Sequence, residues 1–194
     1  MRRITLVLAL AAIMSTTMVL AGQSLAKTTN QNQSTYTDTV NGFEYFADPA
    51  NGIAKFRETA AGDLEGALDG TVHYTGTSTP NVTNTITDGT WILCTRFQAP
   101  PLDPVTHTLI TPACTTDSPI SLTGTWSSGT VQWDATGLYG VAEVKAILTV
   151  TGGSVNDISV SGGSGKFEGT LDHTPLLTGV RPKVNGAVML KVLD

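Results

Sequence analysis

The feature that most constrains the fold is a regular series of strand-like segments broken by glycine in the second half of the chain. From Ile120 onward, segments of alternating apolar and polar residues are separated by short glycine-bearing breaks at residues 127–129, 136–137 and 152–153. Alternation with a period of two is typical of a strand with one buried face, and glycine favours tight turns. Beyond residue 26 the strong helix formers lysine, glutamate, glutamine and arginine are sparse. The sequence therefore predicts an all-β protein.

The strand predicted over residues 138–151 shows the alternation most clearly. Its apolar face carries Ala142, Val144, Ala146, Leu148 and Val150. Further strands are predicted at residues 42–47, 53–58, 68–75, 90–97, 120–126, 130–135, 154–161, 166–171 and 184–193. Roughly eight to ten strands joined mostly by short turns close most simply as an up-and-down barrel. We therefore predict an antiparallel up-and-down β-barrel of about eight strands.

The first 26 residues have the pattern of a cleaved secretory signal peptide. Arg2 and Arg3 supply positive charge, and residues 4–20 are almost wholly apolar. Small residues at 19–21 and at 24–26 give two alternative cleavage sites, and we take residues 1–26 as the signal. The sequence therefore predicts a protein that is secreted or periplasmic.

The rest of the chain divides into a short leader and one domain. Residues 27–39 contain one aromatic and no aliphatic side chain, so we predict a flexible leader over residues 27–40. Removing residues 1–26 from the 194 leaves 168, which is enough to bury one continuous core. We predict a single β-barrel domain over residues 41–194.

Charge and hydropathy exclude two classes of partner. The chain has 11 basic and 16 acidic residues, and cleavage removes Arg2 and Arg3, so the mature formal charge is −7. The longest basic cluster is residues 181–183, so nucleic acids and anionic membranes are not expected partners. No later apolar run approaches the ~20 residues that span a bilayer, so we predict no membrane span.

Cys94 and Cys114 are the only cysteines, and an even count in an oxidising compartment predicts a disulfide bond between them. Zinc binding by the two thiolates and a histidine is the alternative, but the sequence places no further ligands nearby. Residues 98–119 contain five prolines around a short β-like stretch at 106–111. They are predicted to form a long surface loop held by the disulfide.

A glycine-rich turn precedes the last strands. Gly162, Gly163, Gly165, Phe167 and Gly169 match the pattern Gly-Gly-x-Gly-x-Phe-x-Gly. With the strands on either side, this segment resembles the C-terminal part of the allene oxide cyclase and dirigent-like barrel superfamily. The resemblance implies an eight-stranded barrel with an apolar cavity that folds a flexible or reactive small molecule toward cyclisation or coupling. No polar motif of this chain matches the cavity residues of that superfamily, so the resemblance assigns no site residues.

Two Gly-Thr-Trp triplets, at residues 89–91 and 124–126, look like the glycine–tryptophan motifs of lipocalins and avidins. Those families carry the motif on the first strand, whereas both triplets here lie within the chain. By analogy they support a calycin-like barrel in which tryptophan plugs one end.

Catalytic and metal-binding motifs are missing from the sequence. His73, His107 and His173 are dispersed, and no His-x-His or His-Glu-x-x-His pattern occurs. No serine lies in a Gly-x-Ser-x-Gly elbow, which disfavours a nucleophilic hydrolase. We expect surface or hydrogen-bonded histidines, no bound metal and no cofactor.

These observations favour a secreted barrel that binds a small apolar molecule without catalysis. The first alternative is a cyclase or isomerase that controls substrate conformation, for which Tyr74, Tyr139 and Glu143 are the candidate polar groups of the cavity. The second alternative is a structural or interaction protein. In that case the loop over residues 98–119 would present a surface to another protein or to a cell-wall polymer.

Overall fold

A computed structural model describes residues 32–48, 50–106 and 108–194. The predicted signal peptide and residues 27–31 lie outside the described residues. Within them, the strands are β1 (Gln33–Asp48), β2 (Ile53–Gly62), β3 (Gly66–Tyr74), β4 (Thr83–Cys94), β5 (Ile120–Trp133), β6 (Val141–Val155), β7 (Ile158–Val160), β8 (Gly162–Asp172) and β9 (Lys183–Leu193). Two short 3₁₀ helices are η1 (Gly137–Tyr139) and η2 (Thr174–Thr178). In this part of the chain no helix is long and apolar enough to cross a membrane.

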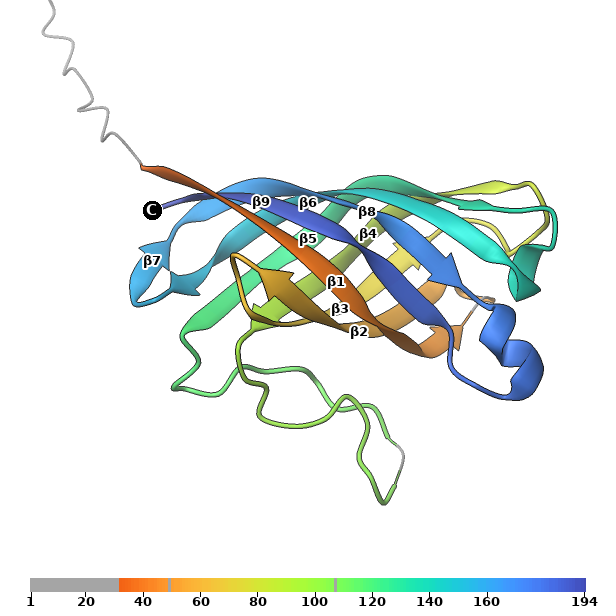
Figure 1. Cartoon of the computed structure of the whole chain (residues 1–194), viewed down its shortest axis with the longest axis horizontal. Coiled ribbons are helices and arrows are strands. Elements are labelled where there is room, and N and C mark those ends of the chain that lie inside the picture. Colours follow the sequence, from red (N-terminus) through yellow and green to blue (C-terminus); the bar gives the residue numbers. More distant parts are fainter. Residues whose placement is uncertain (1–31, 49, 107) are drawn as a thin grey trace, which may run out of the picture. The chain divides into compact units, whose positions relative to one another are not determined.

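Eight of these strands close into an antiparallel barrel (Figure 1). Each strand from β1 to β6 pairs with the next in sequence, β6 pairs with β8, and β8 pairs with β9. The pairing of β1 with β9 completes the circle. The short β7 pairs with the end of β6 and takes no part in the closure. The predicted all-β, up-and-down barrel of about eight strands is therefore confirmed.

The alternation of side chains separates the core from the outer surface. On β6 the residues from Ala142 to Val150 at every second position face the barrel interior, while Glu143 and Lys145 are exposed. Trp126 lies at the centre of the core, where its ring meets the rings of Phe56 at 5.5 Å and Phe167 at 6.0 Å between centroids. Both contacts are edge-to-face, the arrangement that aromatic quadrupoles favour. The barrel interior is therefore the single hydrophobic core of the domain.

Two of the predicted glycine breaks are not turns. Residues 127–129 form an irregularity within the continuous strand β5, and residues 152–153 lie within β6. A side chain on Gly153 would clash with the carbonyl oxygen of Ser121 on the neighbouring strand, so this glycine allows close strand approach. The turn after β6 is made instead by Asn156 and Asp157, which both have positive φ.

The first strand begins inside the segment predicted as a flexible leader. β1 starts at Gln33, and its backbone pairs with β9 from Gln33 onward and with β2 from Asp38 onward. The leader prediction, which covered residues 27–40, is therefore corrected for residues 33–40. It rested on the lack of aliphatic side chains, but backbone pairing with two neighbours holds this segment, and Tyr36 packs against the core.

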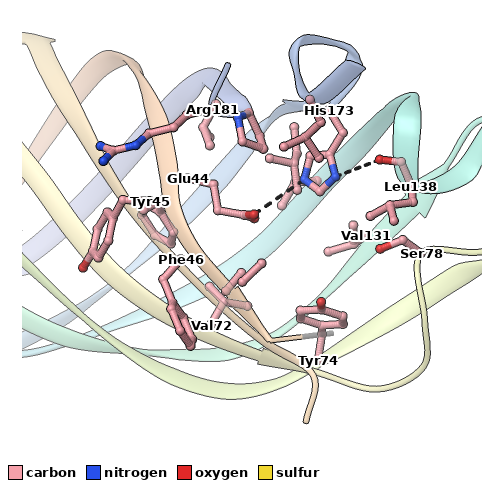
Figure 2. Close-up of a pocket in the computed structure, with 18 of the residues that line it drawn as sticks. Glu44, Tyr45, Phe46, Val72, Tyr74, Ser78, Val131, Leu138, His173 and Arg181 are labelled. Carbon is pink, nitrogen blue, oxygen red and sulfur yellow. Dashed lines mark hydrogen bonds and ion pairs between the residues drawn. The ribbon is translucent and has the colours of Figure 1, made fainter. Parts of the chain in front are cut away.

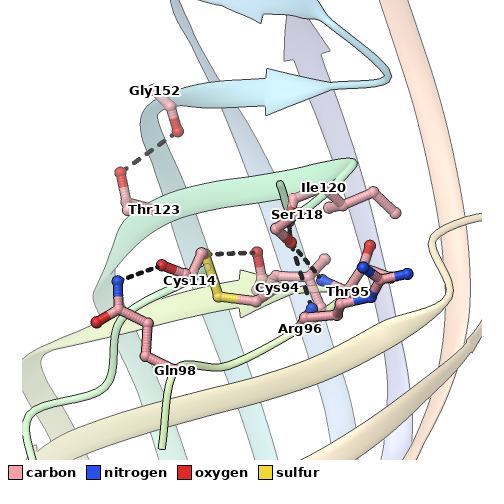
Figure 3. The surroundings of a disulfide bond; sticks show 10 residues. Cys94, Thr95, Arg96, Gln98, Cys114, Ser118, Ile120, Thr123 and Gly152 are labelled. Atoms are coloured by element: carbon pink, nitrogen blue, oxygen red, sulfur yellow. Dashed lines mark hydrogen bonds between the residues drawn. A yellow bond between two sulfur atoms is a disulfide. The ribbon is translucent and has the colours of Figure 1, made fainter. Parts of the chain in front are cut away.

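The segment between β4 and β5 forms a long loop on the outside of the barrel (Figure 1). The predicted disulfide between Cys94 and Cys114 is confirmed, with 5.4 Å between the two Cα atoms (Figure 3). The Ser118 hydroxyl accepts hydrogen bonds from the amides of Thr95 and Arg96 and so joins the two ends of the loop. The predicted β-like stretch at residues 106–111 is reduced to an isolated bridge at Leu109, and His107 lies outside the described residues.

Candidate functional site

One half of the barrel interior is filled by side chains and the other half is hollow. Leu93, Leu122, Leu148 and Leu190 fill the first half and are almost completely buried. In the other half there is a cavity of about 490 Å³. Its walls are mainly aromatic and aliphatic, and include Phe56, Val72, Ile86, Trp126, Val131, Trp133, Val144 and Phe167. The cavity is therefore an apolar chamber inside the barrel wall.

The mouth of the cavity is bordered by the connection between β8 and β9. This connection contains η2, and its residues Leu176, Val180 and Pro182 line the cavity together with Leu138 from η1. η2 ends at Gly179, whose φ of 73° lies in the left-handed region that glycine adopts without strain. Figure 1 shows η2 as the coil at one end of the barrel.

His173 is a buried polar residue of the cavity, and only 4% of it is exposed. It directly follows β8, and its backbone amide donates a hydrogen bond to the carbonyl oxygen of Gly140 at 2.8 Å. Its Nδ1 lies 2.9 Å from the carbonyl oxygen of Leu138, and its ring packs edge-on against Trp133. A carbonyl oxygen only accepts hydrogen bonds, so Nδ1 carries a hydrogen and Nε2 is the nitrogen left for the cavity side.

The side chain of Glu44 points toward His173, and both residues line the cavity (Figure 2). Its Oε1 lies 3.7 Å from Nε2 of His173, and both side chains are buried. Glu44 points inward because it has the same strand parity as Asp38 and Val40, which are also buried. Nε2 has no hydrogen-bond partner among the described residues. The acid and the imidazole therefore form a close pair within an otherwise apolar chamber.

Glu58 on β2 is a second acid in the same cavity, and only 1% of it is exposed. One of its carboxyl oxygens, Oε2, is buried and has no hydrogen-bond partner among the described residues. Burial raises the pKa of Glu58 from 4.5 to about 8, because a charged carboxylate is poorly solvated there. At neutral pH Glu58 is therefore mostly a neutral acid that can donate a hydrogen bond.

Tyr74, predicted as a cavity residue, does line the cavity from the end of β3 (Figure 2). Burial raises the pKa of its hydroxyl, and the charges of Glu44 and Asp48 add to the effect. The hydroxyl therefore stays protonated at neutral pH and offers another hydrogen-bond donor.

The structure places the other two predicted cavity residues, Glu143 and Tyr139, outside the cavity. Glu143 lies on the outer face of β6, 4.0 Å from the amine of Lys145, because Ala142 and Val144 take the inward positions beside it. Tyr139 lies in η1 and is half exposed. The alternation of β6 already assigned Glu143 to the outer face.

The acids that the sequence analysis missed had a detectable signal. Glu58 has the inward parity of Ala54, Phe56 and Ala60 on the strand β2. Glu44 does not lie within a comparable series of inward-facing apolar residues. His173 lies just after the end of β8, where alternation no longer predicts the direction of a side chain. The meeting of Glu44 with His173 depends on β9, which pairs with β1 on one side and with β8 on the other, and no local pattern reveals this closure.

A second buried polar group lies on the outer wall, beneath the long loop. Arg57 donates from Nε to Asp69 at 2.7 Å and from Nη1 to the carbonyl oxygen of Ala99 at 3.0 Å. Its guanidinium stacks 4.1 Å from the ring centroid of Phe97, and the Tyr45 hydroxyl donates to Asp69. This group fastens the loop to the barrel, and of its side chains only Tyr45 also lines the cavity.

The other histidine within the described residues, His73, is partly exposed and contacts Asp88 on the outer surface. In the described part of the chain no group of three or more histidine, cysteine, aspartate or glutamate side chains is arranged to hold a metal ion. The titratable side chains that line the cavity are Glu44, Tyr45, Glu58, Tyr74, His173 and Arg181, and the most deeply buried of them are Glu58, His173 and Glu44.

No protein-family model, curated protein sequence or solved structure matches this chain. Of what the resemblance to the allene oxide cyclase and dirigent-like superfamily implies, the structure shows the closed, eight-stranded antiparallel barrel.

Proposed function

We propose that this protein binds a small, mainly apolar molecule inside the barrel. The observation that carries the proposal is the cavity of about 490 Å³, which lies in one half of a barrel whose other half is filled. Cavities of roughly 300–1,000 Å³ with mostly apolar walls are typical of small-molecule sites. Burial of apolar ligand surface there contributes about 25 cal/mol per Å².

The buried polar groups favour a ligand that is not a pure hydrocarbon. The acid of Glu58 and the hydroxyl of Tyr74 are hydrogen-bond donors at neutral pH, and a buried polar group such as Oε2 of Glu58 is costly without a partner. A ligand with one acceptor oxygen would satisfy such a donor and would be held in one orientation.

The proposal also includes a relationship to a barrel superfamily and a location outside the cytoplasm. The glycine pattern from Gly162 to Gly169 supports a relationship to the allene oxide cyclase and dirigent-like barrels, which use such a cavity for small molecules. The apolar run over residues 4–20 and the disulfide support a secreted or periplasmic protein. The ligand would then be taken up outside the cytoplasm.

Native mass spectrometry of the protein from the cells that make it tests the proposal. We expect an additional mass that is lost on denaturation, and binding of the neutral fluorophore N-phenyl-naphthylamine to the emptied protein. Val144→Phe fills part of the cavity and should abolish both signals. Ile147→Phe places the same ring on the outer face of β6 and is the matched control. A bare mass, together with probe binding that Val144→Phe leaves unchanged, would contradict the proposal.

A further inference from the structure

The protonation of the Glu44–His173 pair follows from its contacts. Nδ1 of His173 carries a hydrogen because it faces the carbonyl oxygen of Leu138, so the lone pair of a neutral imidazole lies on Nε2. Without a further proton, this lone pair would face the carboxylate of Glu44 at 3.7 Å, in a site lined by apolar side chains. One proton on either group removes the repulsion and makes the pair neutral overall. The two side chains are therefore placed to stabilise a proton that either of them takes up.

Glu58 lies close to this pair in the plane of the sheet. On β1 and β2, Gly42 is opposite Glu58 and Glu44 is opposite Phe56, so the two acids occupy diagonal inward positions. Diagonal neighbours of this kind are roughly 7–8 Å apart. The distance suits a short C–C=O unit of a ligand, with one acid at the carbon and the other at the oxygen.

The two acids differ in what they can do. Glu58 holds its proton at neutral pH because it is buried without a charged partner. Glu44 instead has the imidazole of His173 beside it, with 3.7 Å between Oε1 and Nε2. A buried acid and a carboxyl group paired with an imidazole, placed in one cavity, are the groups that an acid and a base role require.

We propose that the cavity catalyses proton transfer on a small apolar ketone, isomerising a β,γ-unsaturated ketone to its conjugated isomer with Glu44 as base and Glu58 as acid. This inference rests on the proposed function, because the substrate is the ligand of the cavity. The isomerisation needs no oxidant, reductant or cofactor, since the product has the same atoms and electrons as the substrate.

The reaction has two steps. The Glu44 carboxylate removes a proton from the carbon between the carbonyl group and the carbon–carbon double bond. The C–H electron pair forms a new carbon–carbon double bond, and the carbonyl π electrons move to the oxygen, which Glu58 stabilises by a hydrogen bond. In the second step the oxygen re-forms the carbonyl double bond, and the new carbon–carbon double bond moves to the position between the α- and β-carbons. The electrons of the original double bond take the proton from Glu44 at the γ-carbon.

His173 is a positioning residue in this scheme, because it acts on the substrate only through Glu44. The other titratable groups that line the cavity with Glu44 are Tyr45 from β1, Glu58 from β2, Tyr74 from β3 and Arg181 from the segment before β9. Tyr74 is a neutral donor at the cavity wall, and the imidazole of His173 is the side chain that forms an ion-pair contact with Glu44, at 3.7 Å. The mainly apolar walls of the cavity surround this pair on the side of the ligand.

The test uses the purified protein with cyclic β,γ-unsaturated ketones of one and two rings. Binding is followed by quenching of tryptophan fluorescence, because Trp126 and Trp133 line the cavity, and turnover by the ultraviolet absorbance of the conjugated product. Glu44→Gln is expected to lower the rate at least 100-fold while quenching is retained. Glu143→Gln, the same change on the outer face, should leave the rate unchanged.

Two further variants separate the roles. Glu58→Gln keeps a hydrogen-bond donor and should retain more of the rate than Glu58→Leu, which keeps none. His173→Gln should lower kcat at pH 7 while KM and ketone quenching change little, because Glu44 loses the side chain that positions it. Retained folding of each variant is checked by its thermal unfolding and by ketone quenching.

The outcomes distinguish this inference from the proposed function. Ketones that bind but are not isomerised, or a rate that Glu44→Gln leaves unchanged, would overturn the inference and leave the binding function standing. Failure of every ketone to quench the tryptophans would overturn the inference, and failure of N-phenyl-naphthylamine to bind as well would overturn the proposed function.

Discussion

Glu58 makes the stability of the folded protein depend on pH. Its pKa is raised from 4.5 to about 8, so the folded chain holds a proton that the unfolded chain has lost. The contribution of Glu58 to stability is therefore fully present below about pH 4.5 and is lost as the pH rises toward 8, at about 1.4 kcal/mol per pH unit.

Glu58→Gln should remove this dependence, because an amide stays neutral. Compared with the wild type, the variant should lose less unfolding free energy between pH 5 and pH 9. Urea denaturation at several pH values measures the difference, with Glu143→Gln as the exposed control. The same pH slope in Glu58→Gln and wild type would show that burial does not hold the proton on this acid.

The ion pair of Arg57 and Asp69 should respond differently to single and double replacement. Asp69 is almost fully buried, so Arg57→Met leaves an uncompensated charge and should cost about 3–5 kcal/mol of unfolding free energy. Arg57→Met with Asp69→Leu removes both charges and should recover most of that loss. The exposed pair of Arg96 and Asp117 is the control, where Arg96→Met should cost about 1 kcal/mol or less. The losses of unfolding free energy are measured by denaturation in urea. A double variant that loses as much as Arg57→Met and Asp69→Leu together would contradict this account.

At the scale of the elements, the disulfide and the long loop stabilise the fold without forming the cavity. The disulfide bond joins Cys94 and Cys114, which are 20 residues apart in the sequence. For a loop of this length, removal of the bond should cost about 3 kcal/mol of unfolding free energy. No described residue of the loop between β4 and β5 lines the cavity. Cys94→Ser with Cys114→Ser should therefore lower the melting temperature but leave the affinity for N-phenyl-naphthylamine unchanged. A loss of affinity in the folded variant would place the loop in the binding site.

The sequence predicted which side chains of a strand face the core wherever apolar residues alternate. The positions of the turns were less predictable. β6 follows its pattern from Ala142 to Val150, because one face must be buried. The glycines at 152–153 carry the same local signal as a turn, but their role is set by Ser121 on the neighbouring strand. β1 was missed over residues 33–40, because its neighbours β2 and β9 hold it by backbone hydrogen bonds that leave no trace in its own side chains.

At the scale of the whole molecule, closure was predictable from the number and order of the strands, whereas the cavity was not. Whether an eight-stranded barrel is filled or hollow depends on the summed volume of side chains from all its strands. Leu93, Leu122, Leu148 and Leu190 meet in one half although they come from four different strands. Glu44 and His173 likewise meet only because β9 returns to pair with β1.

This division of the barrel predicts two levels of local stability within one strand. In β6, residues 147–150 cross the filled half, whereas the segment 142–145 carries Val144, which lines the cavity. The backbone of both segments pairs with β5 and β8. Opening of a segment exposes the side chains packed against it, and fewer contacts are lost beside a cavity. Native-state hydrogen exchange should therefore be at least tenfold slower at residues 147–150, and bound N-phenyl-naphthylamine should slow exchange at residues 142–145 more than at 147–150. Uniform exchange along β6 that the probe leaves unchanged would mean that the cavity half is packed as firmly as the filled half.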